Sequence, residues 1–355
     1  MTSLAEIRKW MPGVMVNAMR ERMISRTSRL DYTQVNIERE EVSLEGANRL
    51  NREGGWREAA EGFNAVMEKE AGAEGDAAVW AEVFMGRCQM LINLGCLGQA
   101  RGDLEKGLGQ IVERLESDDS SYFLARREEK LAWIADYTGD FDQAIWRLNT
   151  AGSYVRQIPQ SKRGEREAGL LSTTVHFLGR AHYGLARQGV NVLKNIGQAR
   201  GYFEEDLRRF EGLRETGRPA WANEGFGHLW LARCDLELVK RDPEGGRKQL
   251  LMEKMQKARR CWKSYLEGRP EDTIMGHYHL LEGEVKLVQG EPETARENFE
   301  KAGEMWKQSG EYSRGMARAL LGIAETWAVE GKWGAALKYV VEAVRLDKTI
   351  LLKPF

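Results

Sequence analysis

A short phrase recurs along the 355-residue chain and constrains the fold more than any other feature. It consists of a glycine, an aromatic or apolar residue two positions later, an alanine three positions after that, and another bulky residue four further on. The first copy reads Gly54, Trp56, Ala59 and Phe63. The later copies begin at Gly95, Gly139, Gly290 and Gly331. Self-similarity of this kind predicts a tandem-repeat fold.

Each position of the phrase has a physical interpretation in a pair of antiparallel helices. Glycine suits the left-handed conformation that ends a helix, and the next bulky residue fills the elbow, where we expect Trp56 and Trp333. Alanine lies where two helices cross too closely for a larger side chain. The residue four positions on lies one turn away on the same face, in the core between repeats, where we also place Trp262. One pair cannot bury its apolar face alone, so several must stack.

The phrase resembles the second-helix half of the tetratricopeptide repeat (TPR). The segments Ala47–Phe63 (ANRLNREGGWREAAEGF) and Gly139–Ala151 (GDFDQAIWRLNTA) follow that pattern closely. The first-helix half is weaker, although Gly283 and Ala324 match its small position. The resemblance implies an all-α fold, a right-handed superhelical solenoid of about seven antiparallel helix pairs.

The spacing of the repeats departs from the 34-residue TPR period. Ala59 to Ala100 is 41 residues, Ala100 to Ala144 is 44, and Ala295 to Ala336 is 41. Longer helices or longer turns are therefore expected. In this respect the chain is similar to the long-repeat TPR domains of kinesin light chains and of bacterial regulators that sense peptides or small molecules.

The middle of the chain, about 160–270, is less regular. Ala199 and Ala258 fit two further units, and the segments 187–196 and 241–248 are expected to be inserted loops because they are polar or contain glycine. We divide the chain into an N-terminal helical capping segment, 1–40, and a continuous repeat superhelix, 41–355. An amphipathic membrane-surface or targeting segment is the alternative interpretation of the basic, methionine-containing first 30 residues.

Composition argues against several classes of partner. Lys and Arg (53) nearly balance Asp and Glu (54), so there is no overall charge that favours nucleic acid or an anionic membrane. The basic stretch 254–263 has the pattern of a solvated helix face. No apolar run approaches the roughly 20 residues of a membrane span. The four cysteines form no C-x-x-C pair, and we expect reduced thiols in a cytoplasmic protein.

Motifs for catalysis are missing from the sequence. There is no phosphate-binding loop, no G-x-S-x-G elbow and no H-E-x-x-H helix. His277 and His279 are two positions apart, which on a helix separates them by about 200° and prevents both from ligating one ion. We therefore predict no enzymatic activity, no cofactor and no metal.

The candidate binding residues come from the irregular middle. All five histidines fall between positions 176 and 279, in segments assigned to first helices of repeats. In TPR proteins these helices line the concave groove, and Trp133 and Trp230 are placed in first helices too. Histidine and arginine together suit an anionic or peptide ligand. The predicted partner-binding groove consists of His176, Arg180, His228, Arg233 and His277.

Three functions remain open from the sequence. The first is a non-catalytic TPR scaffold that binds a peptide or helical segment of a partner protein in its groove. The second is a regulator that responds to a small-molecule or peptide effector and acts through a partner; in this the chain resembles the sensor domains of bacterial transcriptional activators and the Rap-type quorum-sensing regulators. The third is a structural subunit of a larger assembly. The oligomeric state is not predicted.

Overall fold

The computed structural model describes residues 43–53, 56–70, 76–215, 220–243, 245–267, 273–308 and 313–347. The predicted capping segment 1–40, with its alternative as a targeting segment, lies outside these residues. The described part of the chain holds fourteen α-helices and a short 3-10 turn, Gln160–Lys162, and no strand. None of these helices is both long and apolar enough to cross a membrane.

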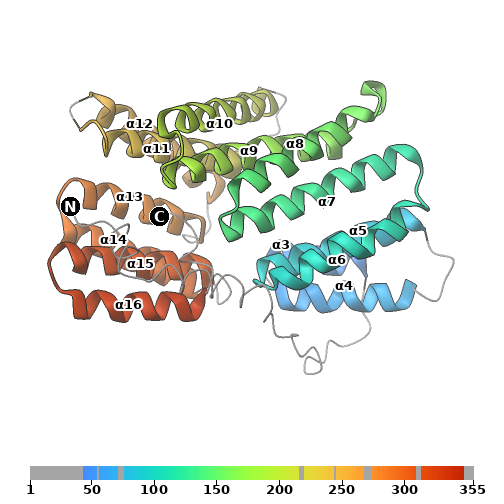
Figure 1. Cartoon of the computed structure of the whole chain (residues 1–355), viewed down its shortest axis with the longest axis horizontal. Helices are drawn as coiled ribbons and strands as arrows, with labels where there is room; N and C mark the ends of the chain where they lie inside the picture. The colour runs from blue at the N-terminus through green and yellow to red at the C-terminus, as the bar shows by residue number, and fades with distance from the viewer. Residues whose placement is uncertain are drawn as a thin grey trace. The chain divides into compact units, whose positions relative to one another are not determined.

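The helices form seven consecutive pairs, as predicted (Figure 1). The pairs are α3 (Leu44–Glu53) with α4 (Trp56–Glu70), α5 (Ala77–Asn93) with α6 (Leu97–Val112), α7 (Ser117–Thr138) with α8 (Phe141–Gln157), α9 (Glu165–Arg187) with α10 (Val192–Glu215), α11 (Trp221–Val239) with α12 (Arg247–Tyr265), α13 (Thr273–Val288) with α14 (Pro292–Gln308), and α15 (Ser313–Val329) with α16 (Trp333–Leu346).

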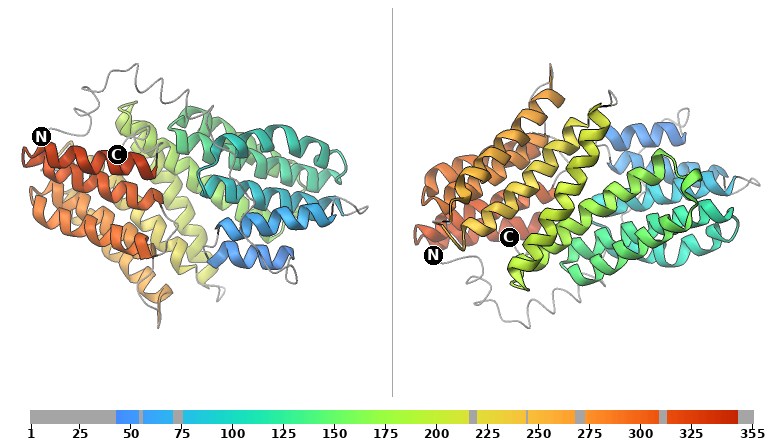
Figure 2. Two further views of the ribbon diagram at one scale, coloured as in Figure 1. Left: turned by 90° about the horizontal axis from the view of Figure 1, so that it is seen from below. Right: turned by 90° about the horizontal axis from the view of Figure 1, so that it is seen from above.

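Two compact units divide the described chain, and the division falls within α9 between Phe177 and Leu178. In the N-terminal unit, helices α5–α8 share a core that includes Phe123 and Leu104. In the C-terminal unit, each helix pair packs on the next, and the views of Figures 1 and 2 agree that α13–α16 lie side by side. Each unit is thus a stack of helix pairs.

The glycines of the phrase end helices as expected. Gly95, Gly139, Gly290 and Gly331 have φ values of 80°, 76°, 81° and 75°, in the left-handed region. A residue with a Cβ is disfavoured there, which explains why glycine recurs at this position. The backbone of Gly54 lies outside the described residues.

The alanine and the following bulky residue are buried in every copy. Each alanine is at most 2% exposed. The partners four positions on are buried as well: Phe63, Leu104, Leu148, Phe299 and Val340. The elbow prediction fails for Trp333, which is 47% exposed. It begins α16, the last described helix, so no later described pair packs over it.

The irregular middle keeps the same core positions but lengthens the helices. Ala199 and Ala258 are 0% exposed, which confirms the two further units. Helices α9 and α10 have 23 and 24 residues and contribute to the longer spacing. The predicted loop 187–196 is wrong in its second half, because α10 begins at Val192. Most of segment 241–248 is a loop as predicted, since α12 begins at Arg247.

Candidate binding site

Trp230 of α11 is the centre of an aromatic and arginine cluster in the C-terminal unit. Its ring stacks on Phe203 at 5.6 Å and meets Tyr183 edge-on at 5.5 Å. The guanidinium groups of Arg180 and Arg233 lie 5.4 and 5.5 Å from the centre of the ring. At this range an indole ring attracts a cation. Trp230 therefore brings the two predicted arginines, from α9 and α11, to one place.

His277 of α13 joins the same cluster. Its ring lies edge-on to Phe226 at 5.3 Å and to Trp306 at 5.2 Å. Burial lowers the pKa of His277 to about 3, and the positive charges of Arg318, Arg233 and Arg180 act in the same direction. The imidazole is consequently neutral at neutral pH. The structure thus places Arg180, Arg233 and His277 within electrostatic range of one another, together with Arg318, which the sequence pattern does not single out.

Two ion pairs fix arginines of the cluster. Arg187 of α9 bonds Glu237 of α11 at 2.6 Å, and Arg233 bonds Glu284 of α13 at 3.1 Å. Burial by itself would raise the pKa of Glu237, but Arg187 and the nearby lysine and arginine of the same helix end lower it to about 2. The carboxylate is therefore ionised although its side chain is 5% exposed.

Tyr183 places a buried hydroxyl among these charges. The residue is 7% exposed, and its oxygen has no hydrogen-bond partner among the residues that the structure describes. Burial raises the pKa of the phenol, and the negative charge of Glu237 adds to this effect. The hydroxyl therefore stays protonated and retains a donor for an incoming acceptor.

The cluster follows one side of successive first helices. Arg180, Tyr183 and Arg187 are spaced by three and four on α9, and the same spacing recurs on α11, so each set lies along one helix face. We call this set the first-helix stripe. It comprises Arg180, Tyr183, Arg187, Trp230, Arg233, Glu237, His277, Glu284 and Arg318.

His228 and His176 are not brought into the stripe. His228 is 9% exposed and lies beside Glu224 and Cys261, between α11 and α12. His176 lies one turn before Arg180 but belongs to the N-terminal unit, where its ring meets Phe177 edge-on at 5.9 Å. The predicted set therefore divides into three residues that are brought together and two that are not.

The remaining histidines have local partners. His182 lies within hydrogen-bonding distance of Asn195, at 2.9 Å, and stacks on Tyr202. His279 lies 3.3 Å from Asn298 on α14. His277 and His279 thus have different neighbours, in agreement with their angular separation on the helix.

The N-terminal unit has a buried charged cluster of its own on α7. Lys130 lies 2.9 Å from Glu129 and 4.1 Å from the ring centre of Trp133, and burial lowers the pKa of this lysine. Trp133 stacks on Phe177 at 4.5 Å, so its ring is used in packing within this unit.

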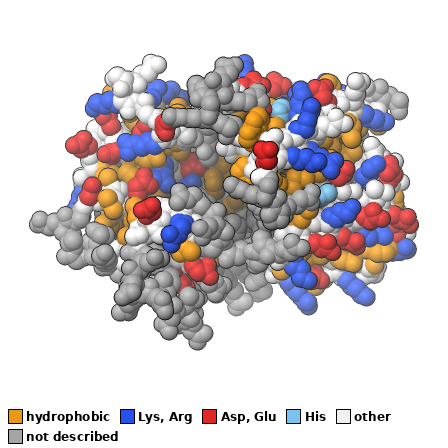
Figure 3. Space-filling model, turned by 180° about the vertical axis from the view of Figure 1, so that it is seen from behind, with side chains coloured by type: hydrophobic (Ala, Val, Ile, Leu, Met, Phe, Trp, Pro, Cys, Tyr) orange, Lys and Arg blue, Asp and Glu red, His pale blue; other side chains and the backbone are white. Residues whose placement is uncertain are grey.

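Surface charge is mixed in sign. On the face shown in Figure 3, lysine and arginine side chains are interspersed with aspartate and glutamate over the described residues. This distribution matches the near-zero net charge of −1. The four cysteines are buried, and none of them forms a disulfide bond in the described part of the chain.

Comparison with known proteins gives a match in fold and none in sequence. No protein-family model and no curated protein matches the chain. Among solved structures, the chain is similar to the crystal structure of Rap protein complexed with competence and sporulation factor. The TM-score is 0.56 at 12% identity, and the match covers 86% of this chain and 76% of that chain. The chain therefore has an all-helical, TPR-like repeat fold.

Proposed function

We propose that this protein is a non-catalytic helical-repeat protein that binds a peptide or helical segment of a partner protein on the first-helix stripe. The observation that carries the proposal is the convergence of Arg180 and Arg233 on Trp230, beside a neutral His277. Tryptophan and arginine are the side chains that most often dominate binding energy at protein interfaces.

The charge of the stripe favours an anionic group on the ligand. Its named residues carry four positive charges, from arginines, and two negative charges, from Glu237 and Glu284. A carboxylate placed near Arg180 and Arg233 would gain charge-assisted hydrogen bonds. The hydroxyl of Tyr183 adds a neutral donor. The free α-carboxylate or an acidic side chain of a peptide has this chemistry.

A regulator that responds to a peptide or small-molecule effector is the second candidate. The similarity in fold to a Rap protein that was crystallised with competence and sporulation factor supports it. In this case the stripe would hold the effector, and a partner protein would carry the response. Four buried cysteines without a disulfide bond suit a reducing compartment, so we place the protein in the cytoplasm.

The test compares one stripe variant with one surface variant. Arg180→Ala and Arg233→Met are combined with Glu284→Gln, so that Glu284 does not keep a charge without its partner. The matched control removes two exposed charges of α12 with Arg260→Ala and Lys263→Ala. Both proteins are compared with the wild type by circular dichroism to establish that the helices are intact.

Binding is measured with a library of fluorescein-labelled peptides, each made with a free carboxylate and with a C-terminal amide. The expected result is a peptide that binds the wild type and the control equally and the stripe variant at least tenfold more weakly. Equal binding to the stripe variant would exclude this site. A metabolite screen by thermal shift on the same proteins separates the effector-binding candidate from the scaffold.

A further inference from the structure

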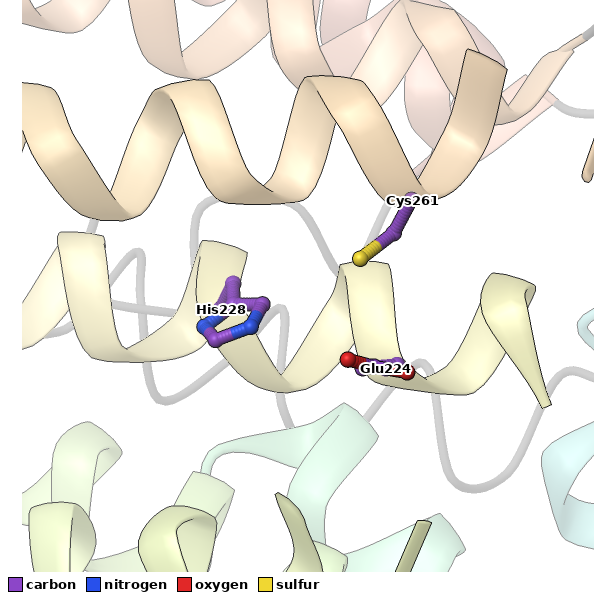
Figure 4. A group of neighbouring side chains, drawn as sticks. All are labelled: Glu224, His228 and Cys261. Atoms are coloured by element: carbon purple, nitrogen blue, oxygen red, sulfur yellow. The ribbon is translucent and has the colours of Figure 1, made fainter. Parts of the chain in front are cut away.

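We propose that Glu224, His228 and Cys261 form a binding site for a transition-metal ion between α11 and α12. The chemical types of the three ligands favour zinc. One potential ligand atom of each residue lies within 4.8 Å of the other two. Figure 4 shows the glutamate and histidine on one helix and the cysteine sulfur directed toward them from the neighbouring helix. The site is separate from the first-helix stripe.

The sequence spacing accounts for the convergence. Glu224 and His228 are four positions apart on α11, so their side chains lie one turn apart on the same face. Cys261 comes from α12, which packs along α11 in the same helix pair. Two helices thus supply three ligands from a rigid part of the repeat.

The neighbouring residue Trp262 holds α12 in register with α11. Its indole nitrogen donates a hydrogen bond to the carbonyl oxygen of Ala222 at 3.1 Å. Its ring lies against Gly225, where an added Cβ would come within 2.2 Å of the indole nitrogen. The position of Cys261 relative to α11 is therefore fixed by packing on both sides of Glu224.

The cluster lies in buried, apolar surroundings. Glu224, His228 and Cys261 are 4%, 9% and 7% exposed, and the adjoining core of this helix pair is apolar. A carboxylate taken out of water is destabilising, as is a thiolate. A divalent cation at the centre would offset both charges and accept the imidazole nitrogen as its third ligand.

The ligand types select the metal. A thiolate, an imidazole and a carboxylate are the donors of zinc, whereas magnesium and calcium take oxygen ligands. Ligand atoms of a tetrahedral zinc site lie roughly 3.5 Å apart. The three potential ligand atoms lie within 4.8 Å of one another, which is compatible with this spacing. Three protein ligands leave a fourth position for water or another small ligand.

A cysteine nucleophile with a histidine base is the competing interpretation of the same residues. A catalytic thiol has to be reached by substrate and is activated by a histidine within hydrogen-bonding distance. Here all three side chains are more than nine-tenths buried, and the Glu224 carboxylate lies within 4.8 Å of the thiol and of the imidazole. The convergence of all three potential ligand atoms on one point favours metal binding over a thiol–imidazole pair.

The sequence predicts no metal site, because His277 and His279, two positions apart on a helix, cannot share an ion. The usable pair is a glutamate and a histidine at a spacing of four, completed by a cysteine 33 positions later, from His228 to Cys261. A cysteine so far along the chain joins the pair only through the antiparallel packing of α11 and α12.

The experiment uses the full chain, freed of metal by a chelator that is then removed. Zinc is titrated in competition with a chromophoric chelator, and cobalt(II) is added separately to detect a thiolate–cobalt charge-transfer band. The wild type should bind one equivalent of zinc and show this band. Zinc should also raise its melting temperature, because the ion binds the folded state.

Variants identify the ligands. Cys261→Ser, which conserves size, should remove the charge-transfer band, and Glu224→Gln should weaken zinc binding at least tenfold while keeping the band. The matched controls Cys234→Ser on the same helix pair and Glu282→Gln on α13 should bind zinc as the wild type does. The proposal is overturned if the wild type binds no stoichiometric zinc, or if Cys261→Ser retains both the band and the affinity. Peptide binding is measured on metal-free protein, so failure of either proposal leaves the other unaffected.

Discussion

The two halves of the C-terminal unit share one repeat architecture but differ in what they bury. In α13–α16 the buried polar residues among those described are Asn298 and Thr326. In α10–α12 and the part of α9 from Leu178 onward, the buried polar residues are His182, Asn195, Asp206, Glu224, His228, Arg233, Asp235 and Glu237. Helices α13–α16 are therefore held by apolar packing, whereas α9–α12 contain a network of charges.

The difference in buried side chains suggests that one half of the unit contributes mainly to stability and the other mainly to binding. A buried charge adds little net stability, because desolvation offsets the attraction of its partner. The glycine–alanine phrase is complete in α13–α16 and fades in α9–α12, where the metal cluster and six of the nine stripe residues lie. We infer that the regular half stabilises the stack and that the irregular half departs from the pattern in order to bind.

The largest expected effect is in the regular half. Phe299 is 1% exposed, and its ring fills the space that glycine leaves at Gly283 on α13 and Gly322 on α15. Phe299→Ala should lower the free energy of unfolding by about 3 to 5 kcal/mol, because it opens a cavity between two helix pairs. Urea unfolding followed by circular dichroism measures this. Glu300→Ala, at the adjacent exposed position, should change stability by less than about 0.5 kcal/mol.

In the irregular half the vulnerable contact is ionic. Asp235 of α11 is 0% exposed and accepts a hydrogen bond from Arg200 of α10; burial raises the pKa of this carboxyl, although Arg200 and Arg247 lower it. Arg200→Met removes the principal partner and should cost about 3 kcal/mol. The double variant Arg200→Met with Asp235→Leu should recover most of the loss in the same urea assay. A double variant as unstable as the single one would show that the charges here are needed for folding.

The sequence predicts the helix pairs well because their signal is local. A glycine that ends a helix and an alanine at a close crossing are required whatever their neighbours are, so Gly290 and Ala295 are recognisable from spacing alone. The exposed Trp333 shows the limit of this reasoning: its position in the phrase is correct, but nothing described packs over it.

The candidate site was only partly predictable because it depends on helix phase. Trp230 and Arg233 are three positions apart and share a face, whereas His228 and Trp230 are two apart and face about 200° from one another. The helix geometry that separates His277 from His279 also separates His228 from Trp230. On this ground His228 does not belong to the predicted binding set. Arg318 is 41 positions after His277, and only the stacking of α13 and α15 brings them close.

Acid should affect the charged half through Glu237. Its pKa in the folded protein, about 2, is below its ordinary value of 4.5. The stabilisation is therefore complete above pH 4.5 and is lost as the pH falls toward 2. Between pH 5 and pH 3 the stability advantage of the wild type over Glu237→Gln should shrink by about 2 kcal/mol. Urea unfolding at both pH values measures it, and an advantage that does not change with pH would contradict the ionised state of this buried carboxylate.

The smallest expected effect tests what the two halves have in common. Gly290, before α14, and Gly246, before α12, have φ values of 81° and 69°, and an added Cβ would meet nothing within 4 Å at either position. Substitution by alanine should therefore cost about 1 kcal/mol in each half, from backbone strain alone. Gly334 in α16 and Gly212 in α10 lie in helices with equal open space, so alanine there should stabilise by up to about 1 kcal/mol. Equal costs at Gly290 and Gly246 would show that the halves share their turn geometry and differ only in what their helices bury. A much larger cost at Gly246 would mean that the charged half also depends on its loop, and the division between packing and binding would then have to be redrawn.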